Sequence, residues 1–316
     1  MKTIADPALV SLIAGVLTLL MFATAAGRIL RLRFADGSAA ATVENINARI
    51  NAWWAMVLLF AAATMTGGFG SILLFAITSF LALREFVTIA PTRPGDHRAL
   101  FWCFFVVTPL QYALIWSGNY ELFSIFVPVG VAVFIATRTA LSGDTERFLE
   151  RTATSQWGVM ICVYFVSYVP ALMTLRIPGY EGQNAKLLFF LVLVVQLSDV
   201  LQYVWGKSIG RRPVAPSVSP NKTWEGFLGG VASAAAVGAA LWWATPFSPA
   251  VAAAMSLVIT LTGFAGGLIM SAIKRGRGVK DYGTLIPGHG GVLDRIDSLC
   301  FAAPVFFHLT RYFYAG

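Results

Sequence analysis

The sequence is poor in charged residues, cysteine and histidine. Asp, Glu, Lys and Arg make up only 12% of the 316 residues, whereas 57% are hydrophobic. A soluble globular domain has about a quarter charged residues, so this composition excludes a soluble globular protein and indicates an integral membrane protein. The three cysteines lie singly in apolar runs with no CxxC spacing, which argues against a disulfide framework or a cysteine-ligated metal site.

Long apolar runs take the place of the missing charge. They predict an all-α, polytopic membrane protein with about ten transmembrane helices. The runs are residues 8–27, 52–66, 69–83, 99–117, 121–137, 156–175, 186–206, 226–245, 249–271 and 298–314. We expect one continuous membrane domain, because no polar stretch between the runs is long enough for a soluble domain.

The basic residues follow a strict alternation along the chain. Of the 23 Lys and Arg residues, 19 lie in segments 28–51, 84–98, 138–155, 207–225 and 272–297, and four lie on the opposite side. The positive-inside rule places those five segments in the cytoplasm and both termini on the non-cytoplasmic side. The net charge of +8 therefore reflects the membrane topology, and we expect no nucleic-acid partner.

The segment Ser271–Asp297 combines cations, carboxylates and glycines between two apolar runs. It contains Lys274, Arg275, Lys280, Asp281, His289, Gly290, Gly291, Asp294, Arg295 and Asp297. Cations and glycine N–H groups hold phosphate, and carboxylates hold the divalent metal that bridges it. Asp294 and Asp297 are spaced i,i+3, which puts both on one helical face. The alternative is that both merely favour the N-terminal dipole of the last helix.

Two segments upstream add to this pattern. Asp199 lies in an otherwise apolar helix, where a carboxylate costs on the order of 3 kcal/mol and should face water or a cation. The alternative is a structural hydrogen bond to a neighbouring helix. Ser219-Pro220 predicts a turn or helix start, with Lys222 and Glu225 on one helical face. Without the Ser271–Asp297 segment, this would be an ordinary cytoplasmic loop.

These residues together resemble the signature of the phosphatidate cytidylyltransferase family, the CDP-diacylglycerol synthases. The family pattern reads S-x-x-K-R, K-D, I/L-P-x-H-G-G and D-R-x-D, and it is matched at Ser271, Lys274, Arg275, Lys280, Asp281, Ile286, Pro287, His289, Gly290, Gly291, Asp294, Arg295 and Asp297. The upstream family motifs are matched at Asp199, Tyr203, Gly206, Lys207, Ser219, Pro220, Lys222, Thr223, Glu225 and Gly226. The resemblance covers residues 186–316, the expected catalytic region, while residues 1–185 form an N-terminal multispan region.

The resemblance implies transfer of CMP from CTP to phosphatidic acid, giving CDP-diacylglycerol and pyrophosphate. It implies a Mg²⁺ site with one or two cations, the second of unknown identity, held among Asp199, Asp281, Asp294 and Asp297. The expected catalytic residues are these four aspartates with Lys222 and Lys280. The expected substrate-binding residues are Lys207, Ser219, Lys222, Glu225, Ser271, Lys274, Arg275, His289, Gly290, Gly291 and Arg295. For His289, phosphate contact or structural support is favoured over acid–base chemistry or metal ligation.

We expect the bacterial inner membrane as the location, with the active site facing the cytoplasm. A homodimer and a downstream CDP-alcohol phosphotransferase are partners that the sequence leaves open. A CTP-dependent enzyme acting on another lipid or polyprenyl phosphate or alcohol remains the alternative. A CDP-alcohol phosphotransferase is rejected, because no D-G-x-x-A-R motif is present. A cation or proton transporter would bury Asp199 but would not need the cationic segment.

Overall fold

A computed structural model describes residues 6–33 and 40–315. Helices form at all ten predicted positions, and the described residues contain one two-stranded sheet besides them. The prediction of an all-α polytopic membrane protein is confirmed at this level. Eight described helical segments are long and apolar enough to cross a membrane. The two others are α11, with 17 residues, and α13, whose first turns carry Asp294, Arg295 and Asp297, so the count of ten is not confirmed.

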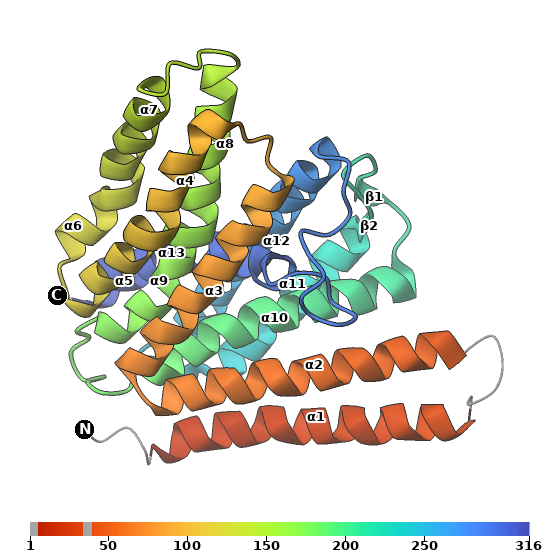
Figure 1. The fold of residues 1–316 in the computed structure, drawn as a ribbon. Coiled ribbons are helices and arrows are strands. Elements are labelled where there is room, and N and C mark those ends of the chain that lie inside the picture. Colours follow the sequence, from red (N-terminus) through yellow and green to blue (C-terminus); the bar gives the residue numbers. More distant parts are fainter. Residues whose placement is uncertain (1–5, 34–39, 316) are drawn as a thin grey trace.

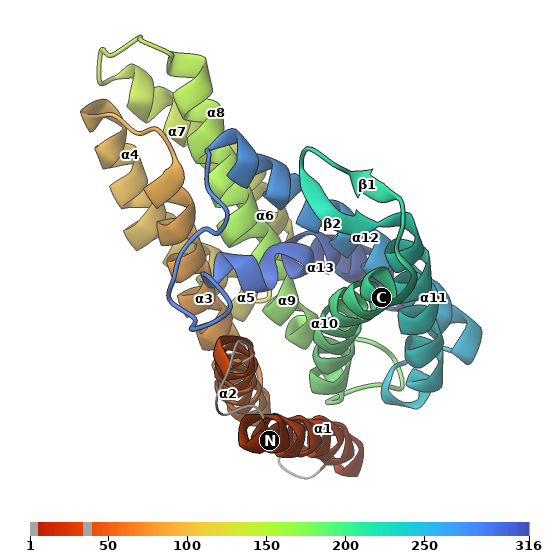
Figure 2. The same cartoon turned by 90° about the vertical axis from the view of Figure 1, so that its right-hand side faces the viewer.

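The first half of the chain forms a hairpin and a bundle. The hairpin consists of α1 (Pro7–Arg33) and α2 (Ala40–Met65), which both views show at one side of the molecule (Figures 1 and 2). The bundle begins with α3 (Gly68–Ile89), and its other three spans are each interrupted by a π-helical turn. These spans contain α4 (His97–Trp102) and α5 (Thr108–Trp116), α6 (Tyr120–Ile125) and α7 (Ala132–Ala140), and α8 (Phe148–Val159) and α9 (Val166–Ala171).

The predicted loop 28–51 is wrong over most of its length. Helix α1 continues to Arg33, and α2 already begins at Ala40. The polar start of α2 is helical because it packs on α1. Asn47 donates from Nδ2 to the carbonyl of Gly27 at 3.2 Å, and Val43 is buried.

The second half surrounds the predicted site with three long helices and a hairpin. These elements are α10 (Asn184–Ile209), β1 (Pro213–Ala215), β2 (Ser219–Thr223), α11 (Trp224–Ala240), α12 (Pro249–Gly276) and α13 (Leu293–Tyr314). The small residues that open α11 permit a close helix contact. A Cβ at Gly226 would lie 2.8 Å from the Gln202 carbonyl oxygen on α10.

The hairpin β1–β2 corrects a second prediction. Ser219 and Pro220 belong to strand β2 and not to a helix start, because Ala215 pairs with Ser219 and Pro213 with Thr223. Helix α11 begins only at Trp224, where Thr223 Oγ1 accepts from the Gly226 N–H at 3.1 Å. Lys222 therefore lies on a strand and shares no helical face with Glu225.

Helix α13 joins the two halves of the chain. It packs against α12 and α10 of the second half and against α9 and α3 of the first. Its Phe306 and Phe307 are buried in the largest core cluster, together with Tyr168 of α9 and Leu187 of α10. Residues 277–292, which we call the α12–α13 loop, lie beside α3 (Figure 2). The position of α13 therefore depends on both halves.

Candidate active site

A polar cavity of about 310 Å³ lies where α10, β2, α12 and α13 meet. Six of the predicted site residues line it: Asp199, Ser219, Lys222, Asp294, Arg295 and Asp297. They come from three segments that are up to about a hundred positions apart in the sequence. The structure thus brings together three of the four aspartates expected to hold metal, along with the predicted cations Lys222 and Arg295.

Asp199 and Asp297 face this cavity with Ser298 between them. The Ser298 hydroxyl donates toward Oδ1 of Asp199 at 3.3 Å, and its oxygen lies 3.5 Å from Oδ1 of Asp297. Neither carboxylate forms an ion pair with any residue that the structure describes. Two half-buried carboxylates that lack an ion-pair partner are costly unless a cation joins them.

Lys222 supplies positive charge to the cavity from strand β2. Its Nζ lies 4.9 Å from the ring centroid of Phe264 on α12, in a cation–π arrangement. A Cβ at Gly267 would lie 2.6 Å from the same Nζ. A side chain at residue 267 would therefore displace the ammonium group from its present position.

Asp294 accepts hydrogen bonds from the protein with both of its carboxylate oxygens. Oδ1 accepts from Lys274 Nζ at 2.7 Å, while Oδ2 accepts from the N–H groups of Tyr282 and Gly291 at 2.8 and 2.9 Å. Both side chains of the ion pair are buried. The carboxylate thus ties the α12–α13 loop to α12. Although Asp294 lines the cavity, it differs from Asp297 in having a buried cation as its partner.

The His-Gly-Gly turn is folded onto its own helix. The Gly291 N–H is donated to Asp294, so it is not one of the free N–H groups that the sequence predicts. Gly290 has a φ of +81°, a conformation that glycine adopts without strain. His289 is buried against Trp53 of α2, with ring centroids 6.3 Å apart. Burial lowers the pKa of His289, and the charges of Arg295 and Arg49 lower it further. A neutral, supporting role follows for this histidine.

Other predicted residues lie outside the described lining of the cavity. Lys207, Lys280 and Asp281 are exposed, and the exposed Arg275 donates to the Val279 carbonyl. Ser271 bonds back to the Gly267 carbonyl within α12. Glu225 accepts hydrogen bonds from the N–H groups of Arg211 and Arg212 at 3.0 and 3.2 Å, which lowers the pKa of Glu225.

In the described part of the chain, no three His, Cys, Asp or Glu side chains form a metal-binding group, so the four predicted aspartates do not form one cluster.

Several site residues escaped the sequence analysis. Gln202, Asn221, Phe227, Phe264 and Ser298 line the cavity. The position of Ser298 next to Asp297 was the one available signal. Gln196 donates to the Arg295 carbonyl at 3.2 Å, and Glu85 accepts from two N–H groups at the start of α13. These two residues lie 99 or more positions from their partners, so no local pattern could identify them.

An apolar groove of about 470 Å³ adjoins the polar cavity. It runs between α2 and α3 on one side and α10, α13 and residues 285–287 on the other. Arg295 lines both the groove and the polar cavity, so the two spaces share a wall. The Nε of Arg295 is buried and has no hydrogen-bond partner among the described residues. A cation between a polar and an apolar space suits an amphiphile with an anionic head.

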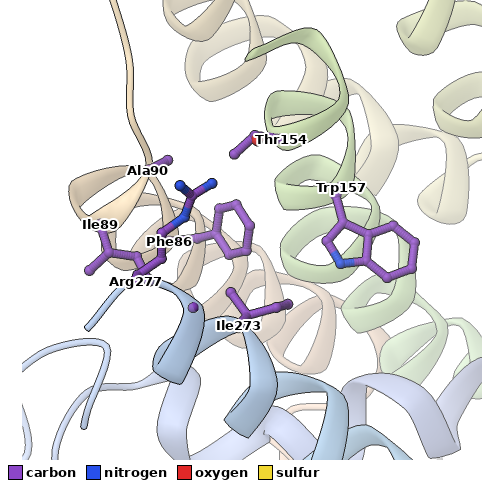
Figure 3. Close-up of a pocket in the computed structure, with 8 residues that line it drawn as sticks. Phe86, Ile89, Ala90, Thr154, Trp157, Ile273 and Arg277 are labelled. Carbon is purple, nitrogen blue, oxygen red and sulfur yellow. The ribbon is translucent and has the colours of Figure 1, made fainter. Parts of the chain in front are cut away.

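A further pocket, of about 250 Å³, lies between α3, α8 and the end of α12 (Figure 3). Its lining includes Phe86, Trp157, Ile273 and Arg277, and none of the predicted site residues. The guanidinium of Arg277 extends past Phe86 toward Ala90 and Thr154. This cation of the α12–α13 loop therefore does not join the polar cavity.

Comparisons with known proteins show the family of this chain. The model of the cytidylyltransferase family matches residues 47–313. The uncharacterized protein YnbB of Escherichia coli K12 is 39% identical over 304 residues, which are 95% of this chain and 97% of that protein. The phosphatidate cytidylyltransferases of Staphylococcus aureus COL and Staphylococcus haemolyticus are 30% and 28% identical over 79% of this chain and 93% of each relative. The chain therefore belongs to the cytidylyltransferase family and is a membrane-embedded nucleotidyltransferase.

Proposed function

We propose that the protein transfers CMP from CTP to phosphatidic acid, giving CDP-diacylglycerol and pyrophosphate. The observation that carries this proposal is the shared wall at Arg295 between the polar cavity and the apolar groove. A nucleotide needs the first space and a lipid needs the second. The names of the staphylococcal relatives support the same reaction.

The chain's own residues suit an in-line transfer without a protein nucleophile. The lipid phosphate oxygen would attack the α-phosphorus of CTP, the bond to the β-phosphate would break, and pyrophosphate would leave. Lys222 and Arg295 approach the cavity from opposite elements and would neutralise the phosphates that must come together. Lys274 would act through Asp294, because its ammonium is already committed to that carboxylate.

The carboxylates of this cavity fit Mg²⁺. Asp199 and Asp297 provide oxygen ligands only, have no described ion-pair partner and lie on either side of Ser298. Proteins bind Mg²⁺ through one or two carboxylates and complete its shell with water and substrate phosphates. When bound, such an ion would neutralise charge that develops on the triphosphate. We assign Asp199 and Asp297 as its direct ligands, and we assign to Asp294 the task of holding the loop.

The lipid tails would lie in the apolar groove. Small or apolar side chains of α2 and α3, among them Ala52, Ala55 and Leu74, line it. A phosphatidic acid molecule whose acyl chains lie there would have its phosphate at Arg295 and its glycerol close to the membrane surface. The positive-inside pattern supports a cavity on the cytoplasmic side of a bacterial inner membrane, where CTP is available. A CDP-alcohol phosphotransferase would consume the product.

A panel of acceptors tests the choice of lipid. Purified protein in detergent–lipid micelles with Mg²⁺ and CTP would be offered phosphatidate, a polyprenyl phosphate, a polyprenol and diacylglycerol. We expect a nucleotide-lipid from phosphatidate that the Asp297→Asn variant does not form. A product from another acceptor with none from phosphatidate would refute the proposed substrate.

A further inference from the structure

A carboxylate from the first half of the chain holds the start of the candidate catalytic helix. Glu85 on α3 accepts from the Val292 N–H through Oε1 at 2.9 Å and from the Leu293 N–H through Oε2 at 2.8 Å. Its side chain is buried, with 9% of the residue exposed. The first N–H groups of a helix have no partner within it, and here a residue 207 positions away provides one.

Two glycines of the α12–α13 loop make this contact sterically accessible. A Cβ at Gly291 would lie 2.3 Å from Oε2 of Glu85, and a Cβ at Gly283 would lie 2.8 Å from Oε1. Real side chains do not tolerate such distances, so both positions are open only to glycine while Glu85 stays in place. These glycines therefore make room for a carboxylate of the protein itself. We infer that Gly291 accommodates Glu85 and does not serve to approach a phosphate.

We propose that Glu85 is a positioning residue for the nucleotidyl transfer, an inference that rests on the proposed function. It fixes the N-terminus of α13, and the same helix presents Arg295 and Asp297 to the polar cavity within its first five residues. Glu85 itself is not among the described residues that line this cavity, so it acts through α13 and not on the substrate. Asp294 holds the loop side of the same turn through Tyr282 and Gly291.

The charge and length of Glu85 both matter for this task. A carboxylate at a helix N-terminus accepts two N–H groups and also interacts favourably with the helix dipole. Glutamine keeps the size but turns one oxygen into an NH₂ group, which faces a backbone donor. Glu85→Gln should therefore release one N–H of α13 and loosen its first turn, while the rest of the helix stays packed in the core.

The test compares Glu85→Gln with Asp96→Asn, which removes a buried carboxylate charge remote from the cavity. Asp96 pairs with Arg151, and both side chains are 3% exposed. For each variant we would measure hydrogen exchange of peptides covering residues 283–299, melting temperature in detergent, kcat, and the Mg²⁺ concentration for half-maximal activity. For Glu85→Gln we expect faster exchange in 283–299, a kcat lower by at least tenfold and a higher Mg²⁺ requirement. Asp96→Asn should lower the melting temperature and leave these three properties unchanged.

A double-mutant cycle provides a second readout. Gly291→Ala should damage kcat as Glu85→Gln does, because its new methyl group displaces the carboxylate. The cycle consists of Gly291→Ala, Glu85→Ala and the double variant. The loss of kcat in the double variant should be smaller than the combined losses of the two single variants, because both changes remove the same contact. Additive effects, or unchanged exchange and kcat in Glu85→Gln, would overturn the proposal, as would a kcat loss no greater than that of Asp96→Asn. If the wild type makes no CDP-lipid, the proposed function fails, while hydrogen exchange still decides whether Glu85 holds α13.

Discussion

Lys274 Nζ lies 2.7 Å from Oδ1 of Asp294, and both side chains are buried. Asp297, one turn further along α13, has no such partner among the described residues. Two aspartates three positions apart therefore have different surroundings, and we assign them different tasks, although the sequence predicts the same one for both. Breaking a buried ion pair leaves an uncompensated charge and costs about 3–5 kcal/mol.

Asparagine at each aspartate should separate these tasks. We expect Asp294→Asn to melt at a much lower temperature, because Lys274 is left buried without its partner. Asp297→Asn should melt at or above the wild-type temperature, because one of two adjacent carboxylates is removed. Its kcat should nevertheless fall by about 100-fold or more, since several kcal/mol of metal-mediated charge stabilisation would be lost.

Melting curves in detergent and initial rates at saturating CTP provide both measurements. Glu121→Gln, at an exposed carboxylate remote from the cavity, is the control and should behave as wild type. Equal melting temperatures for the two aspartate variants would contradict the assignment of different roles.

Gly267→Ala should impair CTP use without harming the fold. The new Cβ would lie 2.6 Å from Lys222 Nζ, so the flexible end of this lysine must shift from its present position. We expect kcat/KM for CTP to fall about tenfold, the equivalent of ~1.4 kcal/mol. Gly263→Ala is the matched control on the same helix, because its Cβ would meet Ser298 Cβ at an ordinary 3.5 Å. Equal rates for the two alanine variants would argue against Lys222 as a phosphate ligand.

A bulky residue in the apolar groove should act on the lipid and not on CTP. Ala55 lines the groove, so Ala55→Trp would fill part of it. Lipid tails gain little from leaving the bilayer for an apolar groove, so the effect should be steric. We expect kcat/KM to fall about tenfold for long-chain phosphatidate, within the usual cost of overpacking, and little for the dihexanoyl form.

Leu58→Trp is the control for that experiment, because Leu58 lies on α2 with 52% of its surface exposed. It should leave both lipids unaffected. The same loss for long and short chains in Ala55→Trp would show that the groove does not hold the tails.

His289 should make the protein less stable in mild acid. Burial keeps its folded-state pKa below the usual value of about 6.5, so the unfolded chain binds the proton more readily. Stability should therefore fall as the pH drops below about 6.5 and level off below the folded-state pKa. Melting temperatures between pH 7.5 and pH 5 should show a smaller decrease for His289→Gln than for the wild type. An identical pH dependence would mean that His289 is not buried in its neutral form.

The sequence predicted the elements that local patterns encode and missed those that depend on distant contacts. Apolar runs predicted helices at all ten positions. The motifs grouped Asp199, Lys222, Asp294 and Asp297, which line one cavity, with Lys280 and Asp281, which do not. The polar start of α2 was predicted as a loop. It is helical because Asn47 packs on Gly27 of α1, and no local pattern encodes that contact. The hairpin β1–β2 is too short for a periodic signal.

The different roles of the aspartates could not be predicted either. Asp294 and Asp297 have the same spacing signal, and only the position of Lys274 at the end of α12 distinguishes them. Glu85 lies in the predicted cytoplasmic segment 84–98, where an acidic residue gives no signal, and only the fold brings it to Val292 and Leu293. Loop glycines predict close approach, but not which group approaches.

Transfer of the CMP group of CTP to the lipid phosphate can be followed with labelled nucleotide. The most direct measurement supplies phosphatidate in micelles with Mg²⁺ and CTP labelled at either the α- or the γ-phosphate, with and without EDTA. We expect lipid label from α-labelled CTP only, labelled pyrophosphate from γ-labelled CTP, and loss of both with EDTA or in Asp297→Asn. Lipid label from γ-labelled CTP would indicate a kinase, and absence of lipid label from well-folded protein would contradict cytidylyl transfer to phosphatidate.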